Sequence, residues 1–94
     1  MKIGRVAATV VTTIKHPALD GRRLLLVDLL DLGGEATGRD LIAVDAVGAG
    51  AGEKVLVLDE GNGARQVLEA PEAPVRAVII GIVDQIELNA GPIL

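Results

Sequence analysis

The sequence contains no cysteine, tryptophan, tyrosine, phenylalanine or serine. Without cysteine there is no disulfide framework, thiolate zinc site or thiol redox chemistry, so nothing favours secretion and we expect a cytoplasmic protein. Without serine or cysteine, only threonine carries a possible nucleophile, at Thr9, Thr12, Thr13 and Thr37. No base stands in a recognisable pattern with any of them, so we predict that the chain is not an enzyme.

Long apolar runs, aromatic rings and excess positive charge are also missing. No segment approaches the roughly 20 consecutive apolar residues that a bilayer span requires. The first residues show a strand-like pattern instead of the apolar core of a signal peptide. Proteins that hold single-stranded nucleic acid stack bases on aromatic rings and neutralise phosphates, whereas this chain carries a net charge of −4. The composition therefore opposes a nucleic-acid partner.

What the chain has instead is much apolar side chain in a small domain. Hydrophobic residues make up 50% of its 94 positions, and its mean hydropathy is +0.49. A domain of this size buries only roughly 60 to 65% of the surface that its unfolded chain exposes. We expect a single domain over residues 1–94 that covers its surplus apolar surface by self-association.

Alternating and β-branched segments predict five β-strands, at residues 3–14, 23–32, 41–47, 54–58 and 77–88. In the first strand, Val6, Ala8 and Val10 fall on one face. The second is apolar on both faces from Leu24 to Val27, which predicts cover on both sides, although a helix is the competing interpretation. A loop is expected at residues 33–38, and a bulge or bend at Gly81.

One segment, residues 64–70, suits a short helix that Pro71 and Pro74 would end. Several short strands in one small domain indicate a closed five-stranded β-barrel, since closure removes exposed edges. We place the barrel in about residues 1–88 and a tail, loose or docked on a neighbour, in residues 89–94. The predicted fold is all-β and similar to an OB barrel, with one short helix.

The glycine-rich stretch between the third and fourth strands does not have the form of a phosphate loop. Gly48, Gly50 and Gly52 fall at every second position, and a strand follows them instead of a helix. A phosphate or dinucleotide site needs the amide groups of a helix N-terminus at that place. The glycines therefore indicate a tight backbone path or close approach of a neighbouring chain, and no cofactor is predicted.

The remaining polar candidates favour structural roles. His16 is the only histidine and stands beside Pro17 in a turn, so we expect an exposed residue and no metal site. Asp28 and Asp31 would point to opposite faces of one strand, which prevents them from acting as a paired acid and base. Asp45 and Asp84 adjoin apolar strands, where carboxylates usually accept hydrogen bonds from the backbone or arginine.

The order of several motifs resembles the EutN/CcmL family, the pentameric vertex proteins of bacterial microcompartment shells. The resemblance is carried by residues 4–6 with 9–11; 13–15 with Leu19, Gly21 and Leu24; 43–50 with 52–53; 55–57; 61–65; and 74–75 with 80–84. Four positions depart from the family pattern: Ala8 replaces a glycine, Asn62-Gly63 replaces two small hydroxyl residues, and Arg76 replaces an acid.

The resemblance implies a flat five-fold ring that closes the vertices of a shell built mostly of hexameric proteins, with neither catalysis nor a cofactor. It places Gly48, Ala49, Gly50, Gly52 and Glu53 at an axial opening or subunit contact. The alternative is a hairpin turn that needs positive φ, with the Ala49 side chain free in solvent.

A second group, Lys15, Asn62, Gly63 and Arg65, is predicted at the rim or an interface. A solvated arginine on a helix is the alternative for Arg65. The alternative function for the whole chain is an OB-like binding module for single-stranded nucleic acid or peptide.

Overall fold

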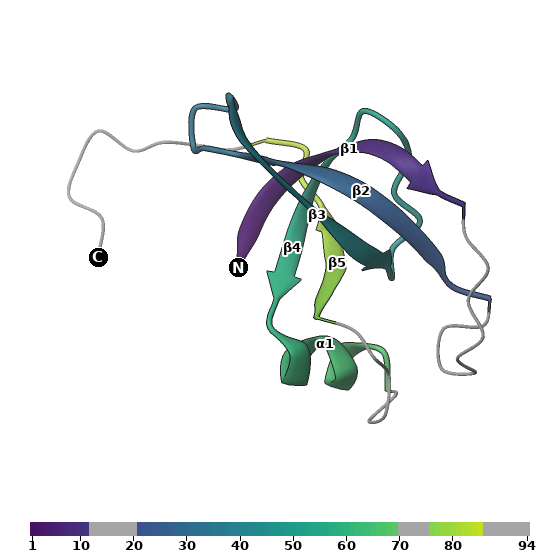
Figure 1. Cartoon of the computed structure of the whole chain (residues 1–94). Coiled ribbons are helices and arrows are strands. Elements are labelled where there is room, and N and C mark those ends of the chain that lie inside the picture. Colours follow the sequence, from purple (N-terminus) through teal and green to yellow (C-terminus); the bar gives the residue numbers. More distant parts are fainter. Residues whose placement is uncertain (12–20, 70–75, 86–94) are drawn as a thin grey trace, which may run out of the picture.

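The computed structural model describes residues 1–11, 21–69 and 76–85. These residues form a closed barrel with the strand order β1-β2-β3-β5-β4, and the helix lies at one end of it (Figure 1). The elements are β1 (Lys2–Val10), β2 (Arg23–Leu30), β3 (Ala36–Asp45), β4 (Lys54–Asp59), α1 (Gly61–Val67) and β5 (Ala77–Ile82). The predicted five-stranded barrel with one short helix is confirmed.

Within the described part of the chain, one pair of neighbouring strands is parallel, β3 and β5, and this contact closes the barrel. Val44 lies opposite Val78 there, and Asp45 lies opposite Ile79. All other neighbouring strands pair in the antiparallel direction. The second segment is therefore a strand, and the competing helix is wrong, because Leu25, Val27 and Leu29 alternate into the interior at the two-residue period of a strand.

Among the described residues, the side chains that fill the interior are all aliphatic, in keeping with a sequence without aromatic residues. The fully buried residues of this core include Leu25, Val27, Val55, Val57 and Ile79. Branched side chains from all sides of the wall fill a barrel of this size, so it is a packed core and not a channel.

Outside the wall, α1 covers a second apolar cluster. Ala64 and Leu68 pack there against Val44 and Val78, with Leu24 at the edge. The outer face of Leu24 is thus partly covered by the same chain. Cover on both sides of this strand was predicted, and at Leu24 the chain's own helix supplies part of it.

The helix begins at Gly61, three residues before the predicted start. The Glu60 carboxylate accepts a hydrogen bond from the Gly63 N–H at 2.6 Å, and the Glu60 carbonyl accepts one from the Ala64 N–H at 2.8 Å. These bonds satisfy backbone groups of the first turn. The two glycines favoured a break in the sequence, but side-chain capping by Glu60 and packing of Ala64 on the barrel outweigh their low helix propensity.

The third strand begins at Ala36, so the predicted loop at 33–38 is wrong in its second half. Asp31 organises the short turn, since its carboxylate Oδ1 accepts the N–H groups of Gly33 and Glu35 at 2.9 and 3.0 Å. The Thr37 hydroxyl then donates to the Leu29 carbonyl at 3.0 Å. The turn therefore needs fewer residues than its glycines suggested, and β3 extends the ladder with β2.

Two bulges change the expected faces. The register between β1 and β2 shifts between Val6 and Ala8, so Val6 is buried whereas Ala8 is exposed, contrary to the shared face that we predicted. In β5, Leu56 lies opposite Gly81 and Val57 opposite Ile79, which leaves Ile80 as the extra residue. This bulge lies one position from the glycine at which it was predicted.

Several predicted features fall outside the described residues: Lys15, His16, Pro17, Pro71, Pro74, the end of the first strand, residues 86–88 and the tail at 89–94. The last described strand ends at Ile82. The division into barrel and tail stays a prediction.

Candidate functional site

Asp45, the last residue of β3, organises the loop at residues 46–53, which we call the glycine-rich loop. Its Oδ1 atom accepts hydrogen bonds from the N–H groups of Val47, Gly48 and Ala49 at 3.0, 3.0 and 3.2 Å. The Asp45 side chain is only 3% exposed. The expectation that this carboxylate accepts backbone hydrogen bonds is confirmed.

Arg23, at the start of β2, holds the same loop from the neighbouring strand. It lies directly opposite Asp45 in the register, and its Nη1 is 3.4 Å from the second carboxylate oxygen. Its Nη2 donates to the Ala49 carbonyl at 3.2 Å. Arg23 could not be recognised as part of this site from the sequence, because a pair of opposite charges 22 positions apart becomes visible only once the register is known.

The second half of the glycine-rich loop is fixed on β1 (Figure 1). Backbone bonds join the Gly52 N–H to the Val6 carbonyl at 2.8 Å and the Val6 N–H to the Glu53 carbonyl at 3.0 Å. Arg5 donates to the Gly52 carbonyl at 2.8 Å. The Glu53 carboxylate accepts from the Gly50 N–H at 2.6 Å. The loop is therefore held at both ends and across its own turn.

The glycines of the loop have different roles within one chain. Gly48 and Gly52 have φ values of 78° and 83°, a conformation that side chains rarely adopt, yet a methyl group on either would meet nothing within 4 Å. Gly50 does not have positive φ. At Gly48 and Gly52 the requirement within the chain is conformational, whereas crowding by other copies stays a prediction.

Ala49 does not point into solvent, so that part of the hairpin alternative is wrong. Its side chain is fully buried and belongs to the barrel core. The bonds from Asp45 and Arg23 to the backbone of residue 49 explain why the loop turns inward at this position. Ala51, at the far end of the loop, is exposed.

The predicted rim residues gather on α1, except Lys15, which is not described. Arg65 is half-buried in the last turn of the helix, not at its start. A methyl group on Gly63 would lie 2.8 Å from both the Leu58 side chain and the Glu60 carboxylate, so glycine fits closely there. Asn62 lies in the same helix. Because α1 packs on β4 and β5, this group lies apart from the part of the glycine-rich loop that is bound to β1.

Asp28 and Asp31 do not lie together as a paired acid and base. Asp28 is exposed on β2, and Asp31 lies in the turn after it, so the predicted placement of both in one strand is wrong for Asp31. Asp84 is exposed after β5.

Asp59 forms two ion pairs within the chain. It accepts a hydrogen bond from Arg76 Nε at 3.0 Å and lies 3.5 Å from Lys2 Nζ. The arginine at position 76, where the family pattern has an acid, therefore has a partner within the chain.

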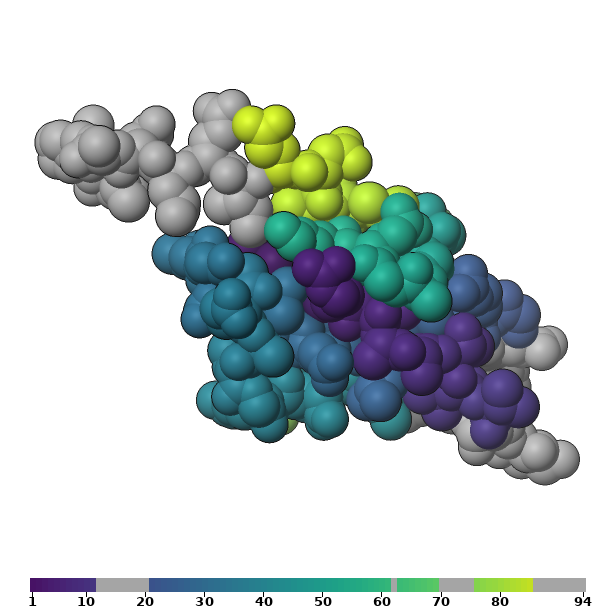
Figure 2. Space-filling model, turned by 90° about the horizontal axis from the view of Figure 1, so that it is seen from above, coloured from purple at the N-terminus to yellow at the C-terminus, as the bar shows by residue number. Residues whose placement is uncertain are grey.

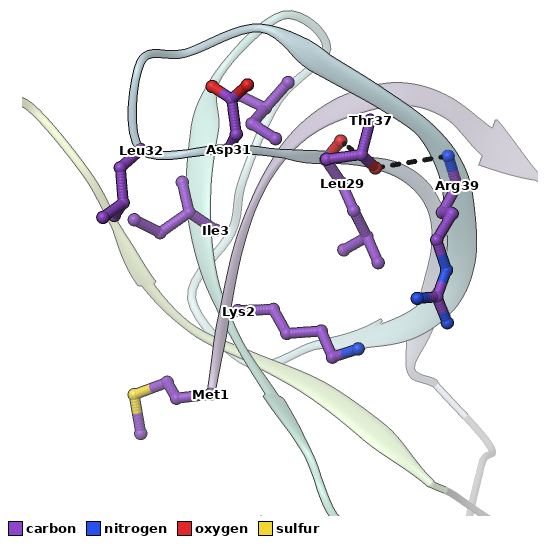
Figure 3. Close-up of a pocket in the computed structure, with 9 residues that line it drawn as sticks. Met1, Lys2, Ile3, Leu29, Asp31, Leu32, Thr37 and Arg39 are labelled. Carbon is purple, nitrogen blue, oxygen red and sulfur yellow. Dashed lines mark hydrogen bonds between the residues drawn. The ribbon is translucent and has the colours of Figure 1, made fainter.

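A pocket of about 520 Å³ opens between β1 and the β2–β3 turn (Figure 3). Lys2 and Arg39 lie on one side of it and Leu32 and Met1 on the other. The Thr37 hydroxyl donates a hydrogen bond to the Leu29 carbonyl and accepts one from the Arg39 N–H.

Two other kinds of site are absent from residues 1–11, 21–69 and 76–85. No three side chains of the metal-binding types cluster there, and no helix is long and apolar enough to span a membrane.

The structure thus defines a small β-barrel protein with a packed aliphatic core, one short helix on the outside of its wall and an ordered glycine-rich loop. The family model described as "Ethanolamine utilisation protein EutN/carboxysome" matches residues 1–84. The chain belongs to this EutN/CcmL family, which confirms the resemblance seen in the sequence.

Named relatives match over almost the whole chain. The carboxysome shell vertex protein CcmL of Gloeobacter violaceus is 42% identical over 93 residues, which cover 99% of this chain and 92% of that protein. The microcompartment shell vertex protein PduN of Salmonella typhimurium is 44% identical over 88 residues, covering 89% and 96%. The solved pentameric microcompartment shell protein GrpN of Rhodospirillum rubrum superposes with a TM-score of 0.82 at 40% identity, covering 94% and 100%.

Proposed function

We propose that this chain is a structural protein that forms a homopentamer and closes a vertex of a bacterial microcompartment shell. Its family membership and the vertex and pentameric shell proteins among its relatives support this assignment. Hexameric shell proteins are the proposed neighbours at its rim. Neither catalysis nor a nucleic-acid partner belongs to the proposal.

The observation within the structure that carries the proposal is an apolar row on the outside of the barrel. Ala8, Leu26 and Ile42 lie directly opposite one another on β1, β2 and β3, and we call them the outer apolar row. Leu25 and Val27, the neighbours of Leu26 in β2, are fully buried, so Leu26 faces outward. Ile42, directly opposite Leu26, is 53% exposed. Apolar side chains that meet on adjacent strands and face outward favour contact with another protein.

The mass of the native particle tests the proposal. Native mass spectrometry is expected to show five copies of the 9.6-kDa chain, and co-expression with shell proteins is expected to give closed polyhedral shells. A stable monomer that binds single-stranded DNA would instead support the binding-module alternative and overturn the vertex assignment.

Ile42→Asp is expected to shift the particle from pentamer to monomer, because a charge in a dry contact without a partner costs several kcal/mol, on the order of 3. Val67→Asp on α1 is the matched control, since Val67 is an exposed apolar residue of similar exposure, 45%, outside the row. Sedimentation at several concentrations measures both. A pentamer of undiminished stability with Ile42→Asp would remove the outer apolar row from the subunit contact.

The glycine-rich loop is the proposed lining of the axial opening or of the subunit contact beside it, through Gly48, Gly50, Gly52 and Glu53, while Ala49 contributes only its backbone because its side chain lies in the core. Asn62, Gly63 and Arg65, with Lys15, are the proposed rim group. The ordered backbone of the loop supports the first placement, because a rigid loop can approach copies of itself closely without losing further conformational entropy.

Two alanine substitutions separate the internal role of the loop from its proposed external role. Ala49→Leu is expected to lower the free energy of unfolding by about 2 kcal/mol, because it overpacks the core. Ala51→Leu is expected to leave the fold intact but to disrupt or narrow the ring, as seen by native mass spectrometry and electron microscopy. Normal rings with an open axis in Ala51→Leu would exclude the loop from the opening.

A further inference from the structure

Four charged side chains form one continuous row across the outside of the barrel. Arg5 on β1 lies directly opposite Lys54 on β4 and, on its other side, opposite Asp28 on β2. Asp28 in turn lies opposite Asp40 on β3. Directly opposite residues share a face of the sheet. We call Lys54, Arg5, Asp28 and Asp40 the charged row.

The signs within the charged row are separated. Its two cations stand side by side on β4 and β1, and its two carboxylates stand side by side on β2 and β3. Like charges directly opposite each other destabilise a sheet. Asp28 and Asp40 are exposed, and the described part of the chain shows no ion pair to the Asp40 carboxylate. Of the three neighbouring pairs in the row, only Arg5 and Asp28 have opposite signs.

The row also faces more than one side of the molecule. It crosses four strands of a closed five-stranded wall, so its cationic end on β4 and its acidic end on β3 point in different directions. Figure 2 shows β1 exposed on one face between β4 and the β2–β3 region. Two copies that met through the same end of the row would bring like signs together, whereas a head-to-tail contact joins the cationic end of one copy to the acidic end of the next.

We propose that the charged row sets the direction of the ring, with Lys54 and Arg5 of one copy facing Asp28 and Asp40 of the next copy. This inference rests on the proposed pentamer. Ile42 follows Asp40 by two residues on the same outer face, so the charged contact is continuous with the outer apolar row. The apolar side chains supply area, and the charges fix which faces meet.

Charge reversal tests this arrangement, because the effects within a chain and between chains have opposite signs. Asp40→Lys removes the repulsion with Asp28 inside the sheet, and Lys54→Glu removes the repulsion with Arg5. Each variant is therefore expected to keep or raise the thermal stability of the fold while it weakens the pentamer at least about tenfold in dissociation concentration. In the double variant Asp40→Lys/Lys54→Glu, opposite signs face each other again, and the pentamer is expected to recover.

Glu35→Lys is the control for Asp40→Lys, since it makes the same change of charge at an exposed position in the turn, outside the row. Native mass spectrometry and sedimentation measure the pentamer dissociation of all four variants from about 50 mM to about 500 mM salt. The wild-type pentamer is expected to weaken over this range, because salt screens the charged contact. If both single reversals assemble as the wild type does, the charged row does not lie in the contact, while the proposed pentamer stands. A wild-type monomer would instead overturn the proposed function.

Discussion

Asp45→Ala is expected to lower the free energy of unfolding by about 3 to 5 kcal/mol, because it removes a buried carboxylate that serves four groups at once. Three N–H groups of the glycine-rich loop lose their acceptor, and Arg23 loses its ion-pair partner. Urea unfolding at a single protein concentration measures the change. The same loss of loop order is expected to release Ala49 from the core, which would weaken ring assembly as well.

Two further variants make this result specific. Asp45→Asn keeps one acceptor oxygen without the charge. It is therefore expected to be less stable than the wild type but more stable than Asp45→Ala. Glu35→Ala removes an exposed carboxylate and is expected to change stability by no more than about 0.5 kcal/mol. A loss below about 1 kcal/mol for Asp45→Ala would show that solvent replaces the carboxylate and that the loop keeps its own shape.

Gly4→Ala is expected to destabilise the fold by about 3 kcal/mol, although it adds only one methyl group. Gly4 is buried in β1, and a Cβ atom there would collide with Cγ1 of Val27 and lie 2.9 Å from the Asp28 carbonyl oxygen. The backbone of β2 cannot retreat without breaking its ladder with β1. Thermal and urea unfolding measure the loss.

Gly81→Ala is the matched control for this substitution. A methyl group on Gly81 would meet only Leu56 Cβ at 3.9 Å, which is an ordinary contact, so the expected change is within about 0.5 kcal/mol. The double variant Gly4→Ala/Val27→Ala is expected to lose less than the sum of its parts, since one collision disappears. Equal losses for Gly4→Ala and Gly81→Ala would contradict close approach as the reason for glycine at position 4.

The strands could be predicted from the sequence because their apolar residues alternate, whereas the boundaries depended on side-chain bonds at the ends. The early start of β3 follows from the compact turn that Asp31 closes, and that of α1 from the cap of Glu60. In both places glycines suggested a loop. Local propensity is weaker there than one well-placed carboxylate acceptor, and a sequence pattern does not show where such a carboxylate points.

The candidate site, like the fold, could be predicted from the sequence only in part. The acceptor role of Asp45 followed from a carboxylate beside an apolar strand. The contributions of Arg23 and Arg5 did not, because each acts across a strand pairing or onto a backbone carbonyl distant in sequence. For Ala49, only the hairpin alternative with its side chain free in solvent was wrong, because the bonds to Asp45 and Arg23 turn that residue inward.

The sequence by itself determined the class of fold, the absence of cysteine and aromatic chemistry, and the family, because alternation, composition and ordered motifs are properties of the chain read in one dimension. Only the tertiary structure decided which residues lie opposite one another. Closure of the barrel and its bulges set that register, and the register made Arg23 a partner of Asp45, exposed Ile42 and aligned four charges in one row. Pairing between distant strands depends on the packing of the whole barrel, and no local pattern contains it.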